Sequence, residues 1–331
     1  MARFFIRPGY TLYAIAVFLS AFLLFAIQPI ASKHLLPYFG GSSSVWATAL
    51  VFFTTILFLG YAYVYALTSM ASRRQVAVHG AVIVLAIGAT TAAVATWGSI
   101  YPPLDWMTTS TVSPALRMLG ALSLAVGIPY FLLSTTGPLL QYWYGVSSAK
   151  EPYKLYALSN AGSLLALLAY PFVIEPTITL SSEETLWTGL FFLYALLLAN
   201  VTLSVRNVPP HVRASASQTG SLIQKAAWTG FAALPAFLLV ATTTVLTQLI
   251  SSVPLLWVVP LAIYLVTFIL AFSGYGSSRT VPLYALVAAG SAYAYTPASP
   301  NEIIPEVLAY FVLLFFACLM CHAELFRRRP M

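Results

Sequence analysis

Long apolar stretches separated by short polar gaps fill this chain, and they constrain its fold more than any other feature. Most are long enough to cross the hydrocarbon core of a bilayer, which takes about 20 helical residues. Of the 331 residues, 60% are hydrophobic and only 7% are charged. A soluble protein could not bury so large an apolar fraction. The sequence therefore predicts an all-α fold, a polytopic bundle of transmembrane helices whose first partner is the lipid bilayer.

The sequence predicts ten membrane-spanning helices, of which the ninth is short and rich in Ala, Gly and Ser. Pro and Gly inside several spans do not contradict this, because neighbouring helices can satisfy the freed backbone groups. The predicted spans are approximately Tyr10–Ile30, Val45–Leu67, Val76–Ile100, Leu116–Leu140, Leu155–Ile174, Leu186–Leu203, Ala226–Leu246, Val253–Phe272, Val281–Tyr295 and Pro305–Cys321.

The basic residues predict the orientation of the chain. If the N-terminus is cytoplasmic, all Lys and Arg except Lys33 and Arg117 lie on the cytoplasmic side, which is 13 of the 15. Most acidic residues lie on the other side. This is the distribution that the positive-inside rule requires of short loops. It predicts a bacterial inner-membrane protein with both termini in the cytoplasm. The net charge of +7 is thus a topology signal, and we expect no nucleic-acid partner because no basic soluble domain is present.

The longest polar gap divides the predicted helices into six and four. We interpret residues 1–203 as a first membrane half, 204–225 as a cytoplasmic linker and 226–331 as a second half. Two halves joined by a cytoplasmic linker are typical of the major facilitator superfamily, in which each half has six helices. Because the second half is two helices short, we expect a membrane-protein partner or a further C-terminal region to complete it. No P-loop or alternating strand–helix region predicts a soluble catalytic domain.

Five motifs follow one another along nearly the whole chain. They are residues 28–46 (QPIASKHLLPYFGGSSSVW), 159–163 (SNAGS), 170–176 (YPFVIEP), 253–261 (VPLLWVVPL) and 321–325 (CHAEL). In their order and spacing they resemble the membrane portion of bacterial spermidine-synthase-like proteins, which join a facilitator-like membrane region to an aminopropyltransferase-like domain.

The resemblance implies a role connected with polyamines or other small cations. In that family the Cys-His-x-Glu-Leu segment is followed by further helices and then by the catalytic domain, so we expect this chain by itself not to transfer aminopropyl groups. The leading hypothesis is a transport or channelling module for a small polar or cationic solute. The alternatives are a structural or accessory subunit of a membrane complex, and the membrane anchor of a spermidine-synthase-like enzyme.

Two groups of polar residues are candidates for a solute path. Glu175 ends the fifth predicted span, and Ser159 with Asn160 lies about four turns earlier on the same helix. Polar groups inside a membrane are costly and are often functional. The alternative is that they join helices, as Ser and Asn commonly do.

The second group lies at the end of the first predicted span and just after it. Gln28, Lys33 and His34 precede a pair of glycines at residues 40–41, and Lys33 and His34 are the basic pair on the outer side. A re-entrant loop here would contact an anionic group. A plain turn between two helices explains the same residues.

The last predicted span carries Cys318, Cys321 and His322 in a C-x-x-C-H pattern. Haem attachment needs the outer compartment, whereas the arginines just downstream place this segment inside. The spacing puts both thiols and the imidazole on one helical face, where they are candidate ligands for a thiophilic metal. The alternative is helix packing, since free Cys often behaves as a small hydrophobe. We expect no other cofactor.

Overall fold

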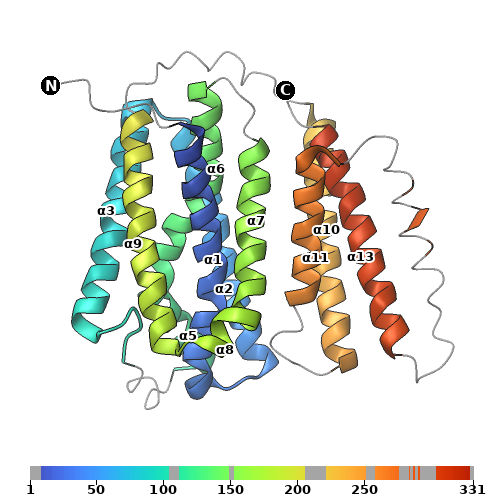
Figure 1. Ribbon diagram of the computed structural model, residues 1–331, viewed down its shortest axis with the longest axis horizontal. Helices are drawn as coiled ribbons and strands as arrows, with labels where there is room; N and C mark the ends of the chain where they lie inside the picture. Colours follow the sequence, from blue (N-terminus) through green and yellow to red (C-terminus); the bar gives the residue numbers. More distant parts are fainter. Residues whose placement is uncertain are drawn as a thin grey trace. The chain divides into compact units, whose positions relative to one another are not determined.

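The computed structural model describes residues 9–103, 112–148, 153–205, 221–250, 258–275 and 303–328, with a few single positions between 283 and 290. Regular structure in these ranges is entirely helical (Figure 1). Eight of the described helices are long and apolar enough to cross a membrane. The chain is therefore a multi-pass, all-α integral membrane protein.

The chain divides into two compact units, Met1–His211 and Val212–Met331. Unit 1 contains α1 (Tyr10–Phe39), α2 (Ser43–Thr68), α3 (Ser72–Trp97), α5 (Pro114–Leu122), the π-helical turn η1 (Ser123–Gly127), α6 (Ile128–Ser148), α7 (Tyr153–Ala169), the π-helical turn η2 (Tyr170–Ile174), α8 (Glu175–Thr177) and α9 (Leu180–Ser204). Unit 2 contains α10 (Leu222–Ile250), α11 (Val258–Leu270), the π-helical turn η4 (Ala271–Tyr275) and α13 (Ile303–Arg327).

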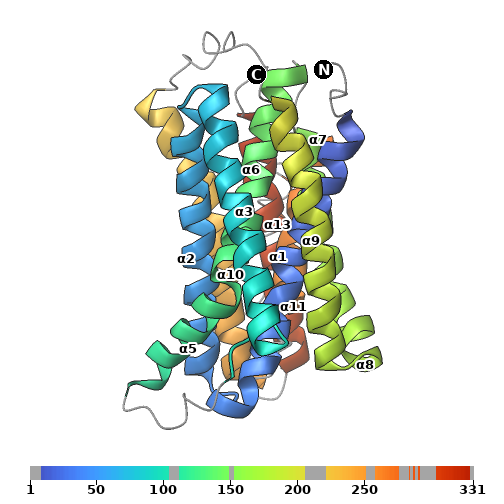
Figure 2. The same ribbon diagram turned by 90° about the vertical axis from the view of Figure 1, so that its left-hand side faces the viewer.

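In unit 1 the helix α1 packs against α6, α7 and α9. Its contact with α7 is the most extensive, and it is closest at Gly162, where a β-carbon would lie 2.6 Å from the backbone oxygen of Phe18. Figure 2 shows α2, α3 and α9 as long, roughly parallel rods on one face of this unit. The buried side chains of α1 join one continuous core with those of α6 and α9.

Unit 2 is built around α13, which packs against α10 and α11. Its last turn carries Glu324, whose carboxylate pairs with both Arg327 and Arg328. The Trp228 indole of α10 donates to the backbone oxygen of Arg328 at 2.9 Å. The first two contacts lie within the end of α13, and the Trp228 hydrogen bond joins that end to α10.

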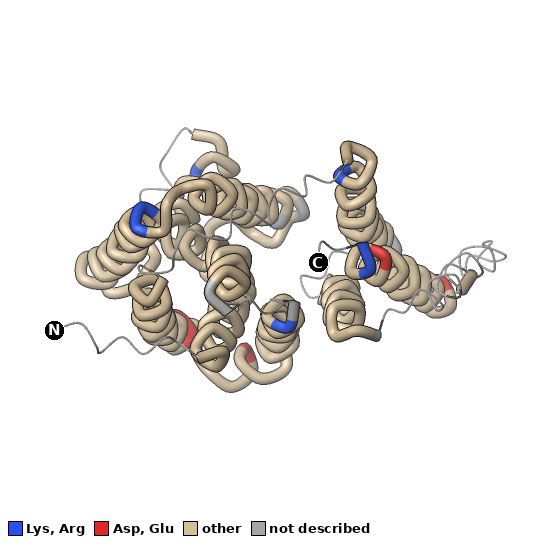
Figure 3. The backbone as a smooth tube through the Cα atoms, turned by 90° about the horizontal axis from the view of Figure 1, so that it is seen from above, with Lys and Arg blue, Asp and Glu red and all other residues tan. Residues whose placement is uncertain are grey.

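Most of the predicted spans correspond to helices. Six of the eight membrane-length helices lie within residues 10–204 and two within 222–327. The predicted span Val253–Phe272 contains a shorter helix, α11, and most of the predicted span Val281–Tyr295 lies outside the described residues. The predicted linker also lies largely outside them, so its role stays a prediction. The helical tubes in Figure 3 are almost wholly free of charged residues.

Several helices extend beyond the predicted ends, among them α6 to Ser148 and α13 to Arg327, and two of these differences affect the candidate site. The first span continues to Phe39, so Lys33 and His34 lie on α1 and the interpretation of residues 31–39 as a loop is wrong. The helix continues because Pro29 and Pro37 each remove only one backbone donor, and packing against α7 and α9 holds the remaining turns. Likewise α9 begins at Leu180, six residues before the predicted start at Leu186.

Candidate functional site

The first turns of α9 carry two adjacent glutamates that are almost fully buried. The Thr179 hydroxyl accepts a hydrogen bond from the backbone N–H of Ser182. This bond caps the helix and fixes its start at Leu180. Glu183 and Glu184 are then only 2% and 7% exposed. Buried carboxylates require hydrogen-bonding or charged partners, so their neighbours define the site.

Glu183 is held by groups from α1 and from the π-helical turn η2. Its Oε1 accepts from Lys33 Nζ at 3.1 Å, and its Oε2 accepts from the Tyr170 hydroxyl at 3.1 Å. Lys33 Nζ also lies 3.9 Å from a carboxylate oxygen of Glu175. Pro171 has no backbone donor, and the wide turn η2 in which it lies carries Tyr170 at its start and ends just before Glu175.

Glu184 is held by α1 and by the segment after α3. Its Oε1 lies 2.7 Å from Nδ1 of His34, and its Oε2 accepts from the Ser99 hydroxyl at 2.6 Å. The Tyr101 ring stacks on His34 with ring centroids 4.0 Å apart. Gly98 turns the chain toward Glu184 with a φ of 73°, a left-handed conformation that favours glycine.

The Tyr101 hydroxyl is buried and makes no hydrogen bond within the described part of the chain. Burial raises the pKa of Tyr101 well above the ordinary value of 10.0, and the charges of Glu184 and Glu183 raise it further. The hydroxyl therefore stays protonated under all physiological conditions. It is an unused hydrogen-bonding group beside two carboxylates.

We call Glu175, Glu183, Glu184, Lys33 and His34 the glutamate cluster. Its three carboxylates face one lysine and one histidine, so its formal charge is −3 + 1 = −2 when His34 is neutral and −1 when it is protonated. The site therefore carries more negative than positive charge at the end of a membrane-spanning bundle. Such an arrangement favours binding of a cation.

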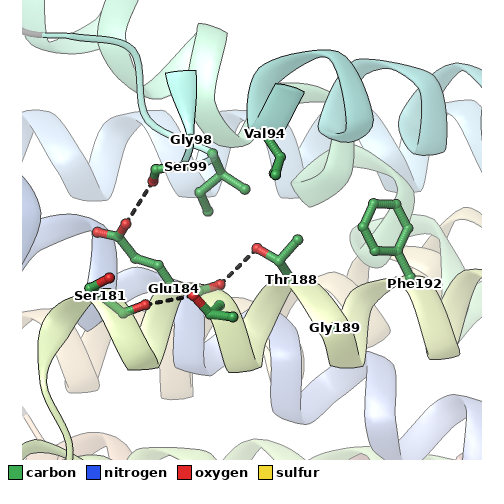
Figure 4. A pocket seen from close by; sticks show the side chains of 10 residues that line it. Val94, Gly98, Ser99, Ser181, Glu184, Thr188, Gly189 and Phe192 are labelled. Carbon is green, nitrogen blue, oxygen red and sulfur yellow. Dashed lines mark hydrogen bonds between the residues drawn. The ribbon is translucent and has the colours of Figure 1, made fainter. Parts of the chain in front are cut away.

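A pocket of about 280 Å³ opens beside Glu184, between α3 and α9. Figure 4 shows the Glu184 carboxylate and Ser99 at one end of this pocket and Phe192 at the other. The lining residues are Val94, Gly98, Ser99, Ile100, Ser181, Glu184, Thr185, Thr188, Gly189 and Phe192. Glu184 is the one ionisable side chain among them.

Of the residues predicted to form a solute path, the structure brings Lys33, His34 and Glu175 together. Gln28 lies about 7 Å deeper along α1, where its amide donates to the Tyr130 hydroxyl at 3.3 Å. Ser159 and Asn160 lie about 20 Å from Glu175 along their helix, and the Asn160 amide bonds the Tyr156 oxygen of the preceding turn. They are not part of the cluster.

Cys318, Cys321 and His322 are buried inside unit 2. Nδ1 of His322 lies 3.0 Å from the Thr267 hydroxyl, and its ring stacks on Phe268. No group of three or more His, Cys, Asp or Glu with the geometry of a metal site occurs among the described residues. The metal interpretation of this segment thus stays a prediction, and its contacts are those of helix packing.

Sequence reasoning missed Glu183, Glu184, Ser99, Tyr101 and Tyr170 as site residues. One signal was present for the glutamates. Thr179 precedes them by four and five residues, and a threonine in that place is a frequent helix cap. A helix starting at Leu180 puts both carboxylates within the first two turns. No sequence signal connects them to Lys33, which is 150 residues away.

Comparison with known proteins gave no match, either to a protein-family model or to a curated protein. The family resemblance drawn from the sequence motifs therefore stays a prediction. The fold and composition establish a multi-pass integral membrane protein, and its role is argued from the glutamate cluster.

Proposed function

We propose that this chain is a membrane transport or channelling module that binds a small cationic solute at the glutamate cluster. One observation carries the proposal. Two adjacent glutamates are buried at the end of a membrane-spanning helix, and the only ammonium paired with them in the described structure is that of Lys33. Charged groups in such positions are costly to maintain, and in membrane proteins they commonly serve ion or substrate pathways.

The position of Lys33 indicates what kind of cation fits. Its ammonium lies between the carboxylates of Glu175 and Glu183, at 3.9 and 3.1 Å. A primary ammonium has three donors, which two carboxylates can accept together. The Lys33 and Glu175 side chains are 31% and 41% exposed, so this place is reached from the surface of unit 1. A solute ammonium can therefore replace that of Lys33.

The sequence motifs support a diamine or polyamine as the solute, since spermidine-synthase-like proteins act on that class. The charge distribution supports a bacterial inner membrane with the glutamate cluster on the non-cytoplasmic side. The six spans within residues 10–204 support a facilitator-like first half, in which transport proceeds by rocking of helix bundles.

One observation favours the alternative of an accessory subunit. Large apolar side chains of α10 are widely exposed, among them Phe237 at 69% and Val240 at 60%. This exposure suits a surface covered by lipid or by helices of another membrane protein. Purification in a mild detergent with fixed amounts of unrelated membrane subunits would support that alternative.

Binding of 1,4-diaminobutane to the purified full chain in nanodiscs tests the proposal. We expect saturable binding that competes with spermidine and weakens at least tenfold in Glu183→Gln, because one charge-assisted hydrogen bond is lost. The matched control is Glu306→Gln, which neutralises a carboxylate of unit 2 outside the cluster. Binding unchanged in Glu183→Gln, or reduced equally in both variants, would contradict the proposal.

A further inference from the structure

The pocket between α3 and α9 changes from polar to apolar along its length (Figure 4). Ser181, Glu184 and Ser99 form the end nearest the start of α9. Phe192 lies twelve residues after Leu180, about 18 Å along the helix from its first residue, and Val94 faces the middle of the pocket. A polar end joined to an apolar end within one pocket matches an amphiphile.

The pocket opens on the outer surface of unit 1. Val94, Thr185 and Gly189 line it and are all exposed. They belong to α3 and α9, and both helices are long and apolar enough to span the membrane. An opening between two such helices lies at a depth where lipid can enter it. Because Glu184 is only about 6 Å along α9 from Leu180, the polar end lies at the depth of the headgroups.

We infer that this pocket holds a phospholipid whose headgroup ends in a primary ammonium, of the phosphatidylethanolamine type. The ammonium would donate to Glu184, whose carboxylate has lone pairs beyond those used by His34 and Ser99. The rest of the lipid then follows α9 from Glu184 toward Phe192, with the glycerophosphate between the ammonium and the acyl chain.

The charge of the pocket selects among lipids. Glu184 is its one ionisable side chain, so an anionic headgroup such as phosphatidylglycerol is repelled. A choline headgroup has no N–H to donate to the carboxylate. A serine headgroup brings its own carboxylate next to that of Glu184. The ethanolamine headgroup alone combines a hydrogen-bonding ammonium with no competing negative charge at its tip.

This lipid site shares Glu184 with the glutamate cluster, whereas the proposed place of the solute ammonium lies between Glu175 and Glu183. Gly189 provides a substitution that distinguishes the two. A β-carbon there meets no atom within 4 Å, so Gly189→Leu is accommodated and places its side chain in the pocket. Gly88 on α3 is also exposed and has equally open surroundings but does not line the pocket, which makes Gly88→Leu the matched control.

The test is the lipid retained by the full chain after reconstitution in vesicles with equal amounts of phosphatidylethanolamine, phosphatidylcholine and phosphatidylglycerol. After gentle extraction, bound lipid is quantified by native mass spectrometry. We expect about tenfold enrichment of phosphatidylethanolamine over phosphatidylcholine in the wild type and in Gly88→Leu, as one hydrogen bond to a charged group provides. In Gly189→Leu the enrichment disappears, while diaminobutane binding persists.

Three outcomes overturn the inference. The first is equal retention of the ethanolamine and choline lipids by the wild type. The second is enrichment that survives Gly189→Leu. The third is displacement of the lipid by water-soluble glycerophosphoethanolamine at equal concentration, which would show that the pocket recognises a free amine and not a lipid. Loss of diaminobutane binding in Glu183→Gln with lipid enrichment intact separates failure of one site from failure of the other.

Discussion

Lys33 of α1 and Glu183 of α9 form a salt bridge of 3.1 Å between helices that are 150 residues apart in sequence. The next residue of each helix repeats the pairing, because His34 lies 2.7 Å from Glu184. Successive helical residues differ by about 100° in direction, so the two pairs use different sides of both helices. The two pairs fix the rotation of α1 against α9 and leave Glu184 at the edge of the pocket between α3 and α9.

Replacing Lys33 with Met removes the ammonium and leaves the Glu183 side chain, which is 0% exposed, without a cation. We expect a loss of about 2–3 kcal/mol in unfolding free energy, less than for a fully buried pair because Lys33 is partly exposed. The measurement is thermal or denaturant unfolding of the purified protein. The control is Lys154→Met, which removes an exposed ammonium outside the cluster.

A double-mutant cycle distinguishes the ion pair from simple loss of packing. In Lys33→Met/Glu183→Gln the charge left by Lys33 removal is that of Glu175, which is 41% exposed, and Glu183 is neutral, so we expect the double variant to be more stable than Lys33→Met alone. Additive effects of the two substitutions would argue against the pairing. Addition of a small alkylamine should also stabilise Lys33→Met, since its ammonium can occupy the vacated place.

Hydropathy was sufficient to predict the helical membrane fold, because apolar helices must span the bilayer whatever their neighbours are. It failed at the ends of helices, where polar residues continue a helix that packs on others. Lys33, His34, Glu183 and Glu184 were all assigned to loops for this reason. Glu175 was recognised as a candidate because it directly follows an apolar stretch.

The pairing of Lys33 with Glu183 and of His34 with Glu184 could not be predicted from the sequence. Which face of α1 meets α9 depends on the packing of four helices, and no local pattern records it. Asn160 illustrates the converse, since its polarity suggested a path but its amide donates within α7, to the Tyr156 oxygen. Ser99 and Tyr101 join the site only because Gly98 turns the chain after α3.

Substituting Gly98 by Ala tests the turn. Its φ of 73° is unfavourable for an L-residue, so we expect destabilisation by about 1 kcal/mol and a displaced Ser99 hydroxyl. Thermal unfolding gives the first effect. Retention of phosphatidylethanolamine gives the second, because Ser99 orients Glu184. Gly120→Ala, at a helical glycine of α5 with open surroundings and no positive φ, should not lower the stability and should leave lipid retention unchanged.

Gly162 is the point where α7 lies closest to α1. A β-carbon there would lie 2.6 Å from the Phe18 backbone oxygen, which cannot rotate away as a side chain does. We expect Gly162→Ala to separate the two helices and to cost about 1–3 kcal/mol. Gly80→Ala is the control, since its β-carbon meets nothing within 4 Å. Equal stability of the two variants in thermal unfolding would contradict the close packing.

Tyr101 predicts the behaviour of the protein at alkaline pH. Burial raises its pKa in the folded state above the unfolded value of about 10, so its contribution to stability is complete below pH 10 and is lost as the pH rises above it. Tyr101→Phe removes this dependence. We expect the unfolding temperature of the variant to fall less steeply than that of the wild type between about pH 9 and 11, a range centred on the ordinary pKa of tyrosine.

At pH 7 the stability of Tyr101→Phe shows what the Tyr101 hydroxyl contributes. Because the hydroxyl is buried and makes no hydrogen bond within the described residues, its removal should be neutral or stabilising by up to about 1 kcal/mol. Destabilisation by more than that amount would show that the hydroxyl has a partner in the membrane-embedded protein. Repeating the measurement with saturating diaminobutane tests whether that partner is the solute, since the two variants should then diverge further.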